Sequence, residues 1–219
     1  MLTKIAGRVR GLFAGNYPEN REDEQFHLNS RGDMIVAQGL PERTELVRLG
    51  DSWQTMLASG VAPLTGLPTT TAGLTVWNGE GASGKSYVID SVFCYEGVVD
   101  VTQSNMTTLF VMLGKPAVAA PVDLGLVIRS LSGRTYGGRA RTVAGGTVVN
   151  DGWFPAGNSA PPAPAAAGSA WKCTDVPLNG MYIVPPGGSF NIHAAKVAAT
   201  AAQCFLGIRW HEVQMIVKS

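Results

Sequence analysis

The chain has 219 residues, enough for one large domain or two small ones whose core needs neither disulfides nor metals. Hydrophobic residues make up an ordinary 45%, but charged residues make up only 15%, against about 25% in typical soluble domains. This composition argues against coiled coils, helical bundles and disordered chains, which need charge or helix-forming residues. The formal net charge of +1 also argues against a general nucleic-acid binder and against a protein held on an anionic membrane.

The first fifty residues contain most of the charge runs, including 19–24 (ENREDE) and 41–48 (PERTELVR), and few strand patterns. We expect residues 1–50 to form an extended N-terminal arm, with one short helix or edge strand after Pro41. The opening residues lack the long apolar core of a signal peptide. The longest apolar stretches are also much shorter than the roughly 20 residues that a membrane-spanning helix needs. The sequence therefore predicts no membrane partner.

Residues 51–219 are expected to form one all-β domain. Short runs of β-branched and aromatic residues alternate with clusters of Gly, Pro, Asn and Thr, as in sandwiches and barrels of short strands. No long amphipathic helix separates the runs, so the strands are expected to pair antiparallel, in a sandwich of hairpins and Greek keys. The pattern predicts eight strands: 73–78, 86–96, 107–113, 123–131, 140–150, 180–186, 188–194 and 203–218.

Loops are predicted for the segments that are rich in small residues and proline. Residues 155–170 (PAGNSAPPAPAAAGSA) are of low complexity and predict a long Pro/Ala surface loop. Residues 60–72 predict a Pro/Thr linker, and the alanine-rich stretch 193–203 predicts a loop or a single short helix. The clearest alternation of apolar and polar residues lies in 203–218, whereas 86–96 alternates on neither face and is expected to be partly covered on both.

One motif is typical of an enzyme. Residues 79–86 (GEGASGKS) match the phosphate-binding pattern GxxxxGK[ST] and follow an apolar run. A working P-loop continues directly into a helix whose N-terminus faces the phosphates, but the residues after Lys85 (SYVIDSVFCYE) form a strand pattern. No second apolar run ends in the acidic residue that would position Mg²⁺. We interpret 79–85 as a hairpin loop whose glycines adopt positive φ, and a P-loop nucleotide-binding protein remains a second alternative.

Cysteine and histidine patterns predict no site. The three cysteines are an odd number without CxxC spacing, which indicates neither a disulfide framework nor a zinc site, and the three histidines are scattered over the chain. We therefore expect no catalytic, cofactor-binding or metal-binding residues, no cofactor, and no enzymatic activity. The cysteines and histidines considered are Cys94, Cys173, Cys204, His27, His193 and His211.

Two groups of residues could serve binding. Arg129, Arg134, Arg139 and Arg141 surround the loop 132–141, which we interpret as a solvated or interface loop in preference to a nucleic-acid site. Tryptophan is enriched both in cores and at the centres of interfaces, and the sequence does not divide the five tryptophans between these roles. In a carbohydrate-binding module, aromatic residues in loops would stack on sugars; the candidates are Tyr136, Trp153 and Trp171.

Three segments together resemble a known family. The runs WNGEGASGKSYVIDSVF at 77–93, YIVPPGGSFNIHA at 182–194 and FLGIRWHEV at 205–213 are similar to β-sandwich virion proteins of tailed bacteriophages, the jelly-roll-like proteins that decorate or cement the head or form short fibres on it. The resemblance implies a jelly-roll-like fold and a structural protein. Such proteins are commonly trimeric, with an arm or loop that reaches a neighbour.

The first hypothesis for function is therefore a structural virion protein of a bacteriophage, made in the host cytoplasm and located on the capsid exterior. Its partners would be the major capsid protein or other virion proteins and further copies of itself, with a homotrimer favoured. The low charge of the β-domain agrees, because obligate interfaces are depleted in charge, and a charged arm becomes ordered only against a subunit or domain surface. The alternative is a receptor- or carbohydrate-binding fibre or tail module.

Overall fold

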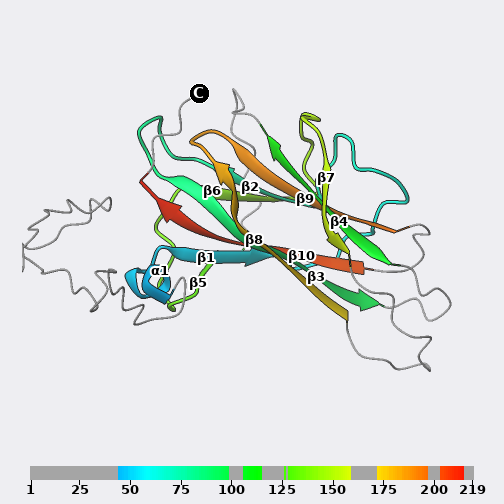
Figure 1. Cartoon of the computed structure of the whole chain (residues 1–219), viewed down its shortest axis with the longest axis horizontal. Coiled ribbons are helices and arrows are strands. Elements are labelled where there is room, and N and C mark those ends of the chain that lie inside the picture. The colour runs from blue at the N-terminus through cyan, green and yellow to red at the C-terminus, as the bar shows by residue number, and fades with distance from the viewer. Residues whose placement is uncertain are drawn as a thin grey trace, which may run out of the picture. The chain divides into compact units, whose positions relative to one another are not determined.

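The computed structural model describes residues 44–98, 106–114, 126, 128–158, 172–196 and 203–214. The chain divides into two compact units, Met1–Glu42 and Arg43–Ser219, and every described residue belongs to the second. Figure 1 shows the elements of this unit. They are α1 (Thr44–Leu49), β1 (Ser52–Met56), β2 (Leu74–Asn78), β3 (Ser86–Val98), β4 (Thr107–Gly114), β5 (Arg129–Ser130), β6 (Ala140–Ala144), β7 (Phe154–Asn158), β8 (Lys172–Val184), β9 (Ser189–Lys196) and β10 (Gln203–Val213).

The helix α1 is the short helix expected after Pro41, and it ends in a glycine cap. Gly50 has a φ of 84°, in the left-handed region that glycine adopts most easily. Its N–H donates to the Val47 carbonyl at 3.0 Å, and the Asp51 N–H donates to the Leu46 carbonyl at 3.1 Å, the paired bonds of a Schellman motif. The cap turns the chain into β1. Within the described residues, no helix is long and apolar enough to span a membrane.

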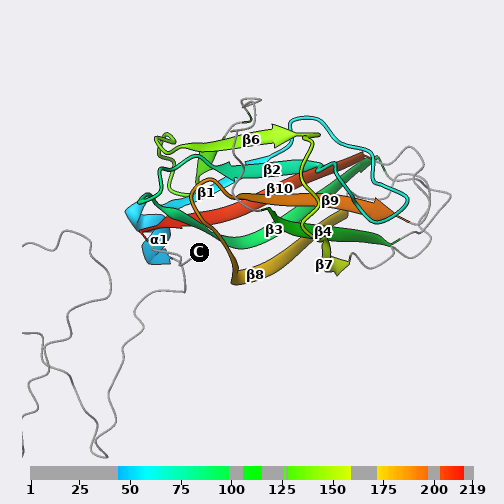
Figure 2. The same cartoon turned by 90° about the horizontal axis from the view of Figure 1, so that it is seen from above.

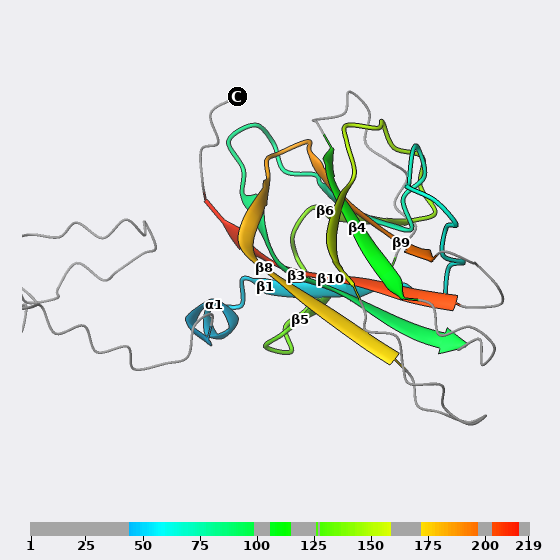
Figure 3. The ribbon, with the colours of Figure 1, turned by 45° about the vertical axis from the view of Figure 1, so that its right-hand side comes forward.

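The ten strands form two antiparallel sheets with the strand orders β5-β1-β10-β3-β8 and β6-β2-β9-β4-β7. Four pairs nest inside one another along the chain: β4 with β7, β3 with β8, β2 with β9, and β1 with β10. The chain therefore behaves as one long antiparallel hairpin wrapped into two facing sheets, which is the jelly roll. Figures 1 and 3 show the two layers. The predicted fold class, an all-β antiparallel jelly-roll sandwich, is confirmed.

Two further strands, β5 and β6, do not belong to the eight strands of the jelly roll. β5 pairs with β1 and β6 pairs with β2, so both extend the sheets beyond the first two strands of the jelly roll. Together they belong to one insertion between β4 and β7. We call residues 129–141 the arginine insertion, because Arg129, Arg134, Arg139 and Arg141 lie in it.

The main core lies between the sheets, and β10 supplies much of it. Leu206, Ile208 and Trp210 are fully buried, as the predicted alternation in 203–218 requires. A second, smaller cluster joins Ala72, Met112 and Trp153 on the other face of the β2-β9-β4 layer. Figure 2 shows the strands of the domain from above. Part of the predicted linker 60–72 packs there, because the Trp153 indole N–H donates to the Thr69 carbonyl at 2.8 Å.

A bulge explains the mixed alternation of β3. Trp210 on β10 pairs with Ile89 and Arg209 pairs with Ser91, so Asp90 is the extra residue of a β-bulge. The inward positions therefore change from Tyr87 and Ile89 to Val92 and Cys94 across the bulge. Both faces of the strand are covered, as predicted, since Val88 and Phe93 are also buried.

Three segments differ from the predicted elements, and two of them are edge strands, where proline and glycine are tolerated. β1 was not predicted, since five residues (SWQTM) give too short a pattern. Residues 155–158 of the predicted Pro/Ala loop belong to the edge strand β7, while 159–171 lie outside the described residues. β8 begins at Lys172, well before the predicted 180, because Pro177 and the positive φ of Asn179 and Gly180 break its pattern.

Three further boundaries shift. Of the predicted strand 123–131, residues 123–125 and 127 lie outside the described residues, and β5 covers Arg129–Ser130. The predicted strand 140–150 ends at Ala144, where Gly145 takes a φ of 64°. Residues 193–196, predicted as loop or helix, continue β9; all four are buried, and Leu64 of the predicted linker forms an isolated bridge with Ala195.

Candidate functional site

The glycine-rich loop 79–85 links the two sheets. β2 and β3 are consecutive in sequence but lie in different sheets, so the predicted hairpin is wrong: in a jelly roll this connection crosses the sandwich. The predicted strand after Lys85 is confirmed as β3, which occupies the place where a P-loop requires a helix. The predicted positive φ values are also wrong, because Gly79, Gly81 and Gly84 all lie outside the left-handed region.

Close packing explains the first of these glycines. A Cβ atom at Gly79 would lie 2.2 Å from the Arg139 carbonyl oxygen and 2.9 Å from the Trp77 ring. The loop therefore rests directly on the backbone of the arginine insertion. The Asn78 side chain fixes the start of the loop, since it donates to the carbonyls of Lys85 at 2.9 Å and Val184 at 3.0 Å.

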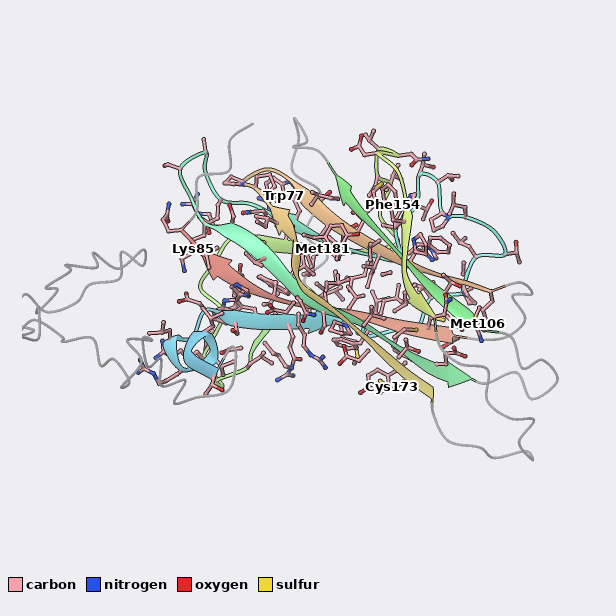
Figure 4. All side chains as sticks on the ribbon, in the orientation of Figure 1. Trp77, Lys85, Met106, Phe154, Cys173 and Met181 are labelled. Carbon is pink, nitrogen blue, oxygen red and sulfur yellow. The ribbon has the colours of Figure 1, made fainter. Side chains whose placement is uncertain are left out.

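The lysine of the motif is held by carboxylates. Lys85 Nζ donates to Asp51 Oδ1 at 3.0 Å and lies 3.7 Å from Glu212 Oε2. Burial alone would lower the pKa of Lys85, but the Asp51 and Glu212 carboxylates outweigh it and raise that pKa above its ordinary value. The ammonium group therefore stays charged and ties β3 to the corner before β1 and to the end of β10. Figure 4 shows Lys85 at the end of the sandwich that carries α1.

Glu212 is the buried member of this group. Its side chain is only 4% exposed, and Tyr136 Oη donates to its Oε1 at 2.8 Å. Burial raises the pKa of Glu212, opposed by the hydrogen bond from Tyr136 and the charge of Lys85. Tyr136 Oη also accepts the Ala140 N–H at 2.8 Å, so the network fastens the arginine insertion to β10.

A cleft of about 480 Å³ opens beside this network. It lies between the glycine-rich loop and residues 134–138, and its charged lining residues are Glu80, Lys85, Arg134 and Glu212. A phosphate placed here would face Glu80 and Glu212, and it would have to compete with Asp51 for the lysine. The geometry therefore does not form a phosphate cradle, and it weakens the P-loop alternative.

The arginine insertion places its four guanidinium groups on the surface, since all four residues are exposed. Arg134 Nη1 donates to the Leu49 carbonyl at 3.0 Å, which fastens the insertion to the end of α1. Arg141 lies over the Trp77 ring, with 5.4 Å between its Cζ and the ring centroid. The four arginines, considered together in the sequence, lie on β5, on β6 and on the loop between these two strands.

Two of the three aromatic residues considered for sugar stacking are engaged in the domain itself. Trp153 is buried in the second cluster, and its indole nitrogen is bonded to Thr69. The Tyr136 ring packs edge-on against Trp53, with 4.7 Å between ring centroids. Trp171 lies outside the described residues. No stacking platform is therefore formed by Tyr136 or Trp153.

The described cysteines and histidines occupy several strands, and two of the thiols are neighbours. Cys94 and Cys204 are buried free thiols that share a hydrogen bond, while Cys173 is exposed. His193 is buried on β9, and burial lowers its pKa. His211 Nδ1 lies 3.0 Å from Asp90 Oδ1 at the β3 bulge, and His27 lies outside the described residues. Within those residues, no group of three or more His, Cys, Asp or Glu side chains is placed to hold a metal ion.

The edges of both sheets are poorly suited to pairing with another strand. β5 has two residues and β6 has five, β7 contains Pro155, and β8 contains Pro177 and a register irregularity against β3. Large apolar side chains nevertheless reach solvent, among them Phe154 at 61% and Met181 at 76% exposure. Figure 4 places them on β7 and β8. The domain is therefore better suited to contact partners through its sheet faces and loops than by pairing an edge strand with a strand of another molecule.

Comparison with known proteins identifies no family, since no family model and no curated protein matches the chain. Among solved structures, a chain from mud crab dicistrovirus is similar at 11% identity over all of this chain and 95% of that one, with a TM-score of 0.22. A chain from a marine algae virus of the order Picornavirales is similar at 14% identity over 99% of this chain and 93% of that one, with a TM-score of 0.24. The jelly-roll assignment rests on the strand order given above.

Proposed function

We propose that this chain is a structural protein of a virus particle that acts through contacts with other virion proteins and with further copies of itself. The observation that carries the proposal is the jelly-roll strand order, an architecture used by viral capsid domains. Lectin domains and cupins share this architecture, but Tyr136 and Trp153, two of the candidate stacking residues of a carbohydrate module, are engaged in the fold. The structural role is the better supported of the two.

The finer form of the proposal follows the family resemblance of the sequence. The particle is that of a tailed bacteriophage, and the protein decorates or cements the exterior of its capsid as a homotrimer made in the host cytoplasm. Residues 1–50 serve as an arm and residues 51–219 as the jelly-roll domain. The low charged fraction of 15% and the exposed Phe154 and Met181 support an assembled state, because interface centres are depleted in charge.

The oligomeric part of the proposal is tested by light scattering coupled to size-exclusion chromatography. One chain has a mass of 23.0 kDa, and the trimer is expected at three times that value. The mass should stay constant from about 50 down to about 1 µM, as expected for a tight complex. A mass of 23.0 kDa throughout would contradict the homo-oligomer.

A further inference from the structure

The arginine insertion is a concentration of positive charge. Residues 124–150 contain four arginines and neither Asp, Glu nor Lys, in a chain whose formal net charge is only +1. Arg129 and Arg139 are exposed, and the ion pairs among the described residues do not include them. A surface of this kind attracts an anionic partner.

Two carboxylates close to the insertion are already paired with a lysine. Asp51 and Glu212 are engaged with Lys85, and Glu212 also accepts the Tyr136 hydroxyl. Glu80 lines the cleft beside Arg134. These acids make the neighbourhood unfavourable for a continuous phosphate backbone, which carries a charge about every 3.4 Å along each strand. A few separate carboxylates are repelled less by these acids than a phosphate backbone is, because each carboxylate can contact an arginine at a position away from the acids.

The insertion is also well anchored for binding. Arg134 is bonded to Leu49, Tyr136 is bonded to Glu212, and the Arg141 guanidinium lies over Trp77. An isolated bridge pairs Arg129 with Thr135, next to Arg134 in the chain. Because these contacts fix the backbone before a partner arrives, little further ordering is needed on binding.

The densest acidic segment of the protein has the complementary charge. Residues 19–24 contain four of the 16 acidic residues of the chain, with one arginine among them. Nineteen residues separate Glu24 from Thr44, where α1 begins, and an extended chain of that length spans at most about 65 Å. That reach is sufficient for contact with an adjacent molecule.

We propose that the arginine insertion is a docking surface for the acidic segment 19–24 of a second copy of this chain. The inference rests on the proposed homo-oligomer and names the surfaces that hold it together. Guanidinium and carboxylate groups form two parallel hydrogen bonds, which favours arginine on one side of the contact. Because the groups are exposed, the association weakens as salt screens them.

The test is a charge exchange in the full-length protein. One variant carries Glu22→Lys, Asp23→Lys and Glu24→Lys, and the other carries Arg129→Glu and Arg139→Glu. Sedimentation velocity at 0.15 M salt should show each variant alone associating at least about ten-fold more weakly than the wild type, because like charges then face each other. An equimolar mixture should associate more tightly than either variant alone, because each variant then meets its complement in two of the three contacts of a trimer; the one remaining like-charged contact keeps the mixture weaker than the wild type.

A matched control adds the same negative charge away from the insertion, with Ala62→Glu, Thr65→Glu, Leu67→Glu and Thr70→Glu at exposed positions. It should associate like the wild type. Two variants that keep the wild-type mass would overturn the docking surface while leaving the homo-oligomer intact. A mixture that stays dissociated would overturn the contact between copies. A monomeric wild type would instead contradict the proposed function.

Discussion

Replacing Lys196 with methionine is expected to lower the free energy of unfolding by about 3–5 kcal/mol. Lys196 Nζ lies 2.7 Å from Glu96 Oε2, and the two side chains are only 6% and 3% exposed. Thr107 Oγ1 donates to the other oxygen of Glu96. The pair joins β3 in one sheet to β9 in the other, and removal of the lysine leaves an uncompensated carboxylate in the core. Urea unfolding at pH 7 measures the loss.

The double variant Glu96→Leu/Lys196→Met is the control. It removes both charges and fills the space with apolar atoms, so it should recover at least half of the lost stability. If the double variant is as unstable as Lys196→Met, the loss comes from packing around the lysine, and the account of an uncompensated charge is wrong.

Replacing Gly79 with alanine is expected to lower the free energy of unfolding by about 1–3 kcal/mol. The added Cβ would lie 2.2 Å from the Arg139 carbonyl oxygen, and backbone atoms cannot move aside as a flexible side chain can. The φ of Gly79 is not left-handed, so the effect arises from space alone. Thermal and urea unfolding of the variant and the wild type measure it.

Gly81 offers a matched control within the same loop. No heavy atom lies within 4 Å of a Cβ built there, so Gly81→Ala should change stability by less than about 0.5 kcal/mol. Equal losses at both positions would show that the loop needs glycine for flexibility. A loss at Gly79 without a loss at Gly81 would show instead that the first glycine of the GxxxxGK[ST] pattern is needed for close contact with the arginine insertion.

Strand alternation made the architecture predictable where a strand has one face in the core. β10 follows that rule, with Leu206, Ile208 and Trp210 inward. The rule fails at β7 and in the first half of β8, because Pro155 and Pro177 suppress a strand pattern while an edge position tolerates them. The sheet membership of β2 and β3 depends on pairing with β9 and β10, more than a hundred residues away, and is invisible in the local sequence.

The chemistry of the candidate site was predictable only in part. The strand after Lys85 could be recognised from its β-branched residues, and this already argued against a P-loop. The carboxylates that hold Lys85 could not be anticipated, because Asp51 is 34 residues away and Glu212 lies near the other end of the chain. The arginines were visible as a group, but their position beside β1 and β2 follows from the pairing of β5 and β6.

The most direct test of the account is cryo-electron microscopy of particles purified from an infected culture, with the protein located by fitting its jelly-roll domain into the map. The account predicts density for the sandwich at symmetry-related positions on the exterior of the head of a tailed phage, in groups of three. Particles that lack this protein, or that carry it only on the tail, would contradict the proposed role on the capsid.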